Sequence, residues 1–262
     1  RPAQTDSYMW VYRTSGDADY PIVLYDYQQG RSGQFAKDYL SGFSGYLHTD
    51  GWNGYHKVEA AGVTLCGCWA HSRRKFQEAL VGAGVKQADS PEAVGLAYCN
   101  QLFAIEKKAE SMTSDDRYEL RKKEAKPVVE TFYQWVEACW ANTLPQSLLG
   151  KALTYAQNQK KYLLAFLADG RIELSNNRAE RSIKPFVIGR KNWLFCNTPG
   201  GAKSSATIYS VIQTALENGL NPQAYLVYVF KQIQQRNDIA VEKLLPWAGE
   251  IPVSCKMPVK KS

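Results

Sequence analysis

Two acidic residues far apart in the chain, Asp50 and Glu180, are candidates for metal-dependent chemistry. Asp50 lies in residues 46–52 (YLHTDGW), where an apolar, strand-like run comes to an end. Strand ends in open α/β sheets face a crevice and are held by rigid backbone, so a carboxylate there can be placed accurately. The alternative interpretation is an ordinary turn aspartate before glycine.

Glu180 lies in residues 175–181 (SNNRAER). If Asn177 is the N-cap of a helix, Glu180 occupies the third helical position and can bond back to the cap as a capping-box acid. The surrounding charge favours a second role, because a metal-binding acid set among phosphate contacts needs nearby cations. We predict that Asn177 contacts DNA together with the five nearby cations Arg178, Arg181, Lys184, Arg190 and Lys191.

A third feature is residues 69–76 (WAHSRRKF), where a strand gives way to a helix. Cations in the first turns of a helix oppose its dipole, and a phosphate partner would offset that cost. The alternative is a basic surface turn anchored by its two aromatic residues. We predict that the basic side chains here contact DNA: His71, Arg73, Arg74 and Lys75.

These features suit transfer at a DNA phosphodiester. Two divalent ions roughly 3.5–4 Å apart can activate the attacking oxygen and steady the leaving oxygen. Mg²⁺ prefers oxygen ligands, so a cluster of carboxylates from rigid elements is needed. A strand-end Asp50 and a helical Glu180 meet that requirement if the fold brings them together.

The composition favours a globular protein with a polyanionic partner. The chain has 262 residues and a net charge of +7, from 32 Lys+Arg against 25 Asp+Glu. It contains neither an apolar run long enough to span a membrane nor a basic-then-apolar signal, so we expect a cytoplasmic, nucleoid-associated protein without membrane contact. The six cysteines lack the spacing of a disulfide framework and are expected to be reduced.

Apolar periodicity predicts a mixed α/β fold. Strands are expected at 8–12 and 22–27 as an antiparallel hairpin, then at 45–48 and 63–68, with a helix at 33–40 between the two pairs. Helices dominate from about 70 to 170 and include one with an apolar stripe through Leu102. The charged run 115–126 in this region is interpreted as a solvated helix face or connection. Further helices are expected at 202–218, with Ile208 facing inward, and from Pro222 onward, before a disordered tail from Pro252.

The motifs together resemble the transposases of the insertion sequence 66 family over nearly the whole chain. They are YLHTDGW at 46–52, CWAHSRRKF at 68–76, NNRAER at 176–181, GRKNWLF at 189–195, IYS at 208–210 and NPQAY at 221–225. The resemblance implies a ribonuclease-H-like mixed sheet interrupted by an all-helical insertion and followed by a helical C-terminal segment. The expected parts are 1–76 (first part of the core), 77–170 (insertion), 171–219 (second part of the core) and 220–262 (C-terminal helices and disordered tail).

The resemblance also implies an Asp-Asp-Glu triad on two Mg²⁺ or Mn²⁺ ions. By motif, Asp50 matches the second aspartate and Glu180 the glutamate, whereas nothing in the chain matches the first aspartate. We therefore expect a catalytic core that lacks one carboxylate and cuts DNA slowly or not at all. The implied partners are terminal inverted repeats, target DNA, companion proteins of the same element and further copies of the chain.

Two alternatives remain from the sequence. The chain could be a non-catalytic, basic DNA-binding module of degenerate or domesticated origin, with structural carboxylates. It could instead be a helical interaction protein with a zinc site at Cys66, Cys68 and His71, although tetrahedral structural zinc needs four ligands.

Overall fold

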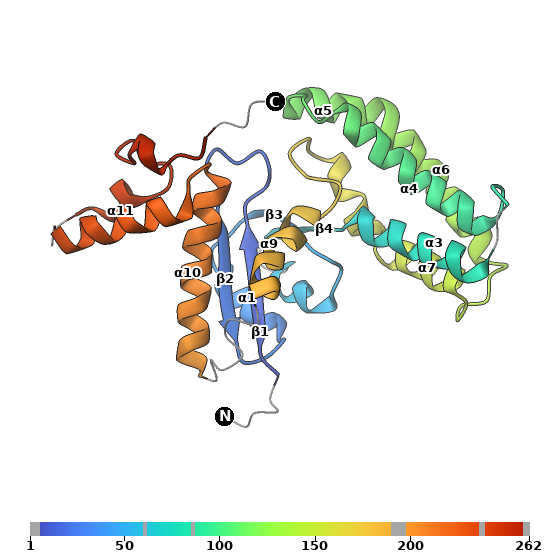
Figure 1. Ribbon diagram of the computed structural model, residues 1–262. Helices are drawn as coiled ribbons and strands as arrows, with labels where there is room; N and C mark the ends of the chain where they lie inside the picture. The colour runs from blue at the N-terminus through green and yellow to red at the C-terminus, as the bar shows by residue number, and fades with distance from the viewer. Residues whose placement is uncertain (1–5, 60–61, 85–86, 190–197, 236–238, 259–262) are drawn as a thin grey trace. The chain divides into compact units, whose positions relative to one another are not determined.

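The computed structural model describes residues 6–59, 62–84, 87–189, 198–235 and 239–258 (Figure 1). The chain divides into two compact units, which we describe separately. The hairpin unit comprises Arg1–Arg31 and Arg178–Ser262, and the helical unit is Ser32–Asn177. No helix within the described ranges is long and apolar enough to cross a membrane.

The hairpin unit is built on two antiparallel strands, as the sequence predicts. Strand β1 pairs with β2 in a register that sets Arg13 opposite Val23. Helix α10 runs along β2 (Figure 1), and β2 side chains pack against it. The elements of this unit are β1 (Tyr8–Arg13), β2 (Val23–Gln28), α9 (Asn177–Ile188), α10 (Pro199–Glu217), α11 (Pro222–Gln235), η5 (Val241–Leu244) and η6 (Val253–Cys255).

Hydroxyl groups of α10 satisfy the outer edge of β2. The Val23 amide donates to Thr214 Oγ1 at 3.1 Å, and the Tyr25 amide donates to Ser210 Oγ at 2.8 Å. Ser210 and Thr214 are one helical turn apart, so one face of α10 meets alternate amides of the strand. Buried amides need such partners, and here a helix supplies them in place of a third strand.

The C-terminal segment corrects two expectations. Ile208 on α10 is 42% exposed rather than inward-facing. The tail is ordered as far as the described residues reach: the Asn221 amide donates to Cys255 O at 2.7 Å, and Cys255 is 2% exposed. The prediction of disorder from Pro252 is therefore wrong up to residue 258, because the tail folds back onto the start of α11.

The helical unit carries a parallel strand pair and a bundle. Strands β3 and β4 pair from Gly45↔Val63 to His48↔Cys66. Four helices, α3, α4, α6 and α7, contact one another in a closed ring. The elements are α1 (Gly33–Tyr39), β3 (Gly45–His48), η1 (Asn53–Tyr55), α2 (His56–Glu59), β4 (Val63–Cys66), α3 (Trp69–Ala83), α4 (Pro91–Lys108), α5 (Ser114–Leu120), η2 (Arg121–Ala125), α6 (Lys126–Trp140), α7 (Leu148–Asn158), α8 (Lys160–Leu163) and η3 (Ala165–Leu167).

The mixed α/β class and the order of the first strands are confirmed. Within the described ranges the strands form two separate two-stranded sheets, β1-β2 and β3-β4. A single ribonuclease-H-like sheet and the four-part domain division stay predictions.

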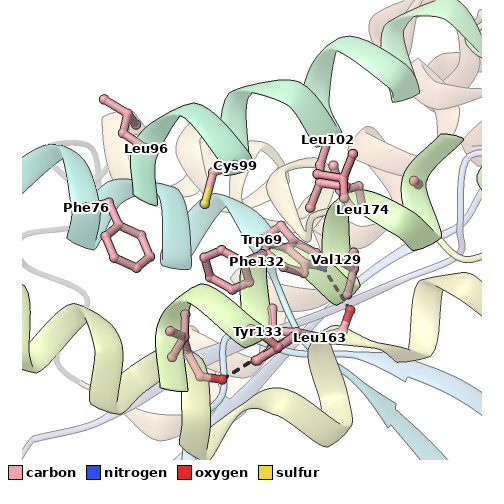
Figure 2. Packing of buried hydrophobic residues seen from close by; sticks show 14 of the residues in the cluster. Trp69, Phe76, Leu96, Cys99, Leu102, Val129, Phe132, Tyr133, Leu163 and Leu174 are labelled. Atoms are coloured by element: carbon pink, nitrogen blue, oxygen red, sulfur yellow. Dashed lines mark hydrogen bonds between the residues drawn. The ribbon is translucent and has the colours of Figure 1, made fainter. Parts of the chain in front are cut away.

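Aromatic side chains fill the bundle core (Figure 2). Trp69, Phe76 and Phe132 are each 0% exposed and meet edge to face, with ring centroids 5.3 Å (Trp69–Phe132) and 6.0 Å (Phe76–Phe132) apart. The Trp69 indole N–H donates to Leu163 O at 2.9 Å, so the largest core residue also satisfies its polar atom. The predicted apolar stripe through Leu102 is confirmed, since it is 1% exposed.

The charged run 115–126 is helical, and one of its cations is buried. Arg121 is 0% exposed in the π-helical turn η2, just before Pro127. Its guanidinium donates to both Glu106 carboxylate oxygens at 2.7 Å and to the carbonyls of Phe166 (2.8 Å) and Asp169 (2.9 Å). Reading the whole run as solvated is thus wrong at Arg121, because this residue joins three segments of the unit.

Replacing Arg121 tests this clamp. Arg121→Ala should lower the free energy of unfolding by about 3–5 kcal/mol, because it leaves the Glu106 carboxylate without its partner. Lys122→Ala is the matched control, since the neighbouring Lys122–Glu119 pair is exposed and should change stability by less than about 1 kcal/mol. Urea unfolding followed by circular dichroism measures both, and similar losses for the two variants would refute the clamp.

The loop after β3 is held by a close backbone approach. Gly51 has φ +84°, and a Cβ built there would lie 3.0 Å from Oε1 of Gln159. The side-chain amide of Gln159 therefore lies against the backbone of Gly51, the residue that follows Asp50. Only glycine combines this φ with this contact at little cost.

Gly51→Ala should destabilise the protein more than Gly42→Ala. Both glycines have positive φ (+84° and +82°), but a Cβ at Gly42 meets nothing within 4 Å. The backbone strain of roughly 1–2 kcal/mol is shared, and crowding against Gln159 adds about 1 kcal/mol more at Gly51. Combining Gly51→Ala with Gln159→Ala in a double-mutant cycle should cancel the excess. Equal losses for Gly51→Ala and Gly42→Ala would show that the contact is unimportant.

Candidate functional site

Asp50 lies just beyond the carboxyl end of β3, where the sequence predicts it. The Thr49 amide donates to Cys66 O at 2.9 Å, which extends the parallel ladder to the residue before Asp50. Asp50 Oδ1 accepts the Trp52 amide at 3.0 Å, and Trp52 packs edge-on against Tyr55. The turn and the strand end together fix the carboxylate at the edge of the β3-β4 pair.

Helix α7 brings two polar side chains to the same edge. Gln159 lies against Gly51, and Tyr155 is one turn earlier on the same face of the helix. Burial raises the pKa of Tyr155, with further contributions from Cys68 and the Asp50 charge. Tyr155 therefore remains a protonated phenol in the electrostatic field of Asp50.

The buried oxygens of this unit that have no hydrogen-bond partner among the described residues include Tyr155 Oη, Gln159 Oε1 and Asn176 Oδ1. The backbone amide of Asn176 donates to Cys68 Sγ at 3.4 Å, which attaches Asn176 to the segment that follows β4. Buried polar groups are nearly always paired, so unpaired oxygens near a strand-end carboxylate are unusual. Their chemistry suits a ligand that donates hydrogen bonds or binds oxygen.

His48 is the last residue of β3 at this edge. Its Nε2–H donates to Gly67 O at 2.7 Å, linking the ends of β3 and β4. Burial lowers the pKa of His48, and the neighbouring His71 lowers it further, while Glu173 and the bond to Gly67 oppose the shift. His48 is thus a neutral, structural imidazole near neutral pH.

The predicted basic residues of α3 have different surroundings. Lys75 Nζ lies 5.1 Å from the Tyr155 ring centroid, which places it beside α7. Arg73 turns toward α4, where its Nε donates to Asn100 Oδ1 at 2.6 Å and its guanidinium lies over Phe103. Arg74 is exposed and His71 is half-buried in the first turn of the helix. Their contacts with DNA stay predictions.

Glu180 lies in the first turn of α9 in the hairpin unit. This helix begins at Asn177, so Asn177 is its first residue rather than the residue before it. Arg13 holds α9 by donating to Ser182 Oγ at 2.8 Å, and it pairs with Glu217 of α10 at 2.8 Å. The Tyr25 hydroxyl donates to Ser182 O, so β1, β2 and α10 together position the helix that carries Glu180.

Cations of α9 lie on the same short helix as Glu180. Arg181 and Lys184 are exposed, and Arg178 is half-buried. The predicted Arg190 and Lys191 lie outside the described residues. Exposed cations within one or two turns of an acid are suited to phosphate contacts, as the sequence predicts.

The structure brings Asp50, Lys75, Tyr155 and Gln159 together within the helical unit. Glu180 belongs to the hairpin unit, so its convergence with Asp50 stays a prediction. The described part of the chain contains no group of three or more His, Cys, Asp or Glu able to hold a metal ion. The Asp50 edge nevertheless fits a hard cation, because it combines a carboxylate with the Gln159 amide oxygen, which has no partner among the described residues.

The zinc hypothesis has less structural support than a metal site at Asp50. Cys66, Cys68 and His71 do not form a metal-binding group within the described residues. Cys66 and Cys68 are both buried, and burial raises the pKa of the Cys66 thiol to about 12. The soft-ligand motif therefore behaves as part of the core.

Sequence reasoning missed Tyr155, Gln159 and Arg13. The signal for Gln159 was its position on the apolar stripe of α7 through Ala152 and Ala156, where a polar residue is unexpected. Arg13 carried no such signal, because its partners lie 169 and 204 positions away.

Comparison with known proteins gives a consistent family assignment. The model of the family described as "Transposase IS66 family" matches residues 1–204, and that of the "IS66 C-terminal element" matches residues 210–247. Two similar proteins of Sinorhizobium fredii (strain NBRC 101917 / NGR234), described as "Uncharacterized protein y4qI" and "Uncharacterized protein y4hP", are 32% and 29% identical to this chain. Each alignment covers 93% of this chain and 47% of the relative, so the chain spans about half the length of these proteins. No solved structure gives a significant match. The chain therefore belongs to the IS66 family of DDE transposases.

Proposed function

We propose that this chain forms the catalytic core of a transposase that cuts and joins DNA at the ends of an insertion sequence. The observation that carries the proposal is the place of Asp50 at the carboxyl edge of two parallel strands, inside a chain of the IS66 family. The edge combines a fixed carboxylate with oxygens that lack partners and a nearby cation, Lys75. Such a set serves reactions at a charged phosphodiester.

In this proposal Asp50 and Glu180 hold two Mg²⁺ or Mn²⁺ ions together. Bound divalent ions would neutralise charge on the phosphate and activate the attacking oxygen. Residues of the chain would position the two acids. The backbone amide of Trp52 orients the Asp50 carboxylate by a hydrogen bond, and Arg13 fixes the helix that carries Glu180. Motif matching assigns two of the three acids of the triad, and the first aspartate has no match in this sequence.

The cations of α3 and α9 would contact the DNA backbone. Phosphate contacts orient the duplex and make binding dependent on salt. Terminal inverted repeats, target DNA, companion proteins of the element and further copies of the chain are the proposed partners. The proposed contact residues are His71, Arg73, Arg74, Lys75, Asn177, Arg178, Arg181, Lys184, Arg190 and Lys191.

Asp50→Asn and Glu180→Gln should each abolish DNA cleavage, tested in a chain extended to the full length of the relatives. We expect a loss of roughly a thousandfold or more with Mg²⁺, because metal catalysis contributes several kcal/mol to the barrier. Affinity for an inverted-repeat duplex should change by less than about threefold, since direct phosphate contacts remain. Gel-based cleavage and fluorescence anisotropy measure the two properties.

Exposed acids in each unit provide the controls. Asp38→Asn in the helical unit and Glu242→Gln in the hairpin unit should leave cleavage unchanged. Undiminished cleavage by Asp50→Asn or Glu180→Gln would reject the assigned role. Salt-sensitive DNA binding without metal-dependent cleavage, even in the extended chain, would favour the non-catalytic DNA-binding module.

Iron-directed cleavage of the protein tests the convergence of the two acids. Fe²⁺ substituted for Mg²⁺ generates hydroxyl radicals in the presence of ascorbate and peroxide, and these cut the backbone close to the bound ion. We expect fragments that end near residue 50 and near residue 180, and Asp50→Asn should remove both sets. Cuts near residue 50 alone would show that Glu180 does not share the ion.

A further inference from the structure

Gln159 occupies a position where the helix pattern calls for an apolar residue. It continues the buried face of α7 formed by Leu149, Ala152 and Ala156, and it is only 8% exposed. A long polar side chain loses both hydration and rotamer freedom at such a site. Its presence there requires a compensating interaction.

Capping of α7 or α8 does not explain why the Gln159 side chain is polar. The Gln159 backbone is already bonded on both sides: its amide donates to Tyr155 O at 3.0 Å, and its carbonyl accepts the amides of Tyr162 (3.0 Å) and Leu163 (2.8 Å). Gln159 thus joins α7 to α8 through its backbone alone. Its side-chain Oε1 is buried and has no hydrogen-bond partner among the described residues.

The side chain is directed at the Asp50 loop. Its amide lies so close to Gly51 that an added Cβ would be 3.0 Å from Oε1 and 3.1 Å from the amide carbon. Tyr155, one turn earlier, has its pKa raised in part by Asp50. Asp50, Gly51, Tyr155 and Gln159 therefore line one polar site within the helical unit.

The chemistry of an amide oxygen narrows the choice of partner. Oε1 only accepts hydrogen bonds, and a phosphodiester has no proton to donate. A hydrated divalent ion offers strong donors, because Mg²⁺ and Mn²⁺ usually keep several coordinated waters. Outer-shell acceptors of this kind orient the ligands of metal sites and tune their affinity.

We propose that Gln159 is a positioning residue of the Asp50 metal site, with Oε1 accepting a hydrogen bond from the hydration shell of a divalent ion that Asp50 binds. The inference rests on the proposed function, since it takes Asp50 as a metal ligand. It gives the helical insertion a direct part in the site: α7 supplies the residue opposite the strand end.

Mn²⁺ binding to this chain tests the inference without any DNA reaction. Water-proton relaxation enhancement reports bound Mn²⁺ across a millimolar titration. We expect Gln159→Met, which keeps the length of the side chain, to weaken Mn²⁺ binding about tenfold. Gln159→Glu keeps acceptor oxygens and should bind Mn²⁺ within about threefold of the original chain or more tightly.

Two further variants separate the possible failures. Gln157→Met changes the same helix on a different face and should leave Mn²⁺ affinity within about twofold. Asp50→Asn should remove the enhancement. Unchanged affinity in Gln159→Met, with binding lost in Asp50→Asn, would overturn this inference alone.

The remaining outcomes are also decisive. Enhancement that persists in Asp50→Asn would remove the metal role of Asp50 and, with it, both proposals. No enhancement in the original chain would overturn the inference, while the cleavage assay still decides the proposed function. If Gln159→Met melts differently from the original chain, Gln159→Glu decides, because weakened binding with its acceptors intact contradicts the role.

Discussion

A parallel pair of short strands cannot stand alone, and this constraint shapes the candidate site. Two strands of four residues leave most of their edge groups without partners. The residues just after β4 bond to segments that follow the bundle: the Gly67 amide donates to Tyr162 O of α8 at 2.9 Å, and the Trp69 amide donates to Leu174 O at 3.1 Å. Since these carbonyls follow the bundle helices in sequence, the strand ends depend on the bundle for their hydrogen bonds. The Asp50 edge and the bundle therefore form one structure rather than a core with a dispensable addition.

Local patterns predicted a large part of this fold. The hairpin, the strands at 45–48 and 63–66 and the apolar stripe through Leu102 follow from alternation and helical spacing, which act over a few residues. The place of Asp50 at a strand end was predicted for the same reason. Burial of Arg121 could not be predicted, because it depends on partners brought close only by tertiary packing, and a charged side chain in a polar stretch gives no local sign that it is enclosed. The apolar stripe of α7 indicated that Gln159 is buried, but its contact with Gly51 also depends on tertiary packing.

The Glu180 side of the proposed site is organised by a different principle. Here one guanidinium, Arg13, joins a strand to two helices through Ser182 and Glu217, and its side chain is 6% exposed. Phe186 of α9 packs against Tyr25 and Tyr209, and the three ring centroids lie 5.3–6.1 Å apart. Asp50 is held by backbone hydrogen bonds at a strand end, whereas Glu180 is held by side chains of a packed helix. Both arrangements hold in place the backbone that carries the carboxylate.

The hydroxyls of Ser210 and Thr214 have a consequence beyond packing. Exposed strand edges recruit strands from neighbouring molecules, and proteins must protect them against aggregation. By engaging the Val23 and Tyr25 amides, α10 removes alternate donor positions from the open side of β2. A helix that carries two small hydroxylated residues one turn apart thus blocks the addition of a strand from another molecule at these positions.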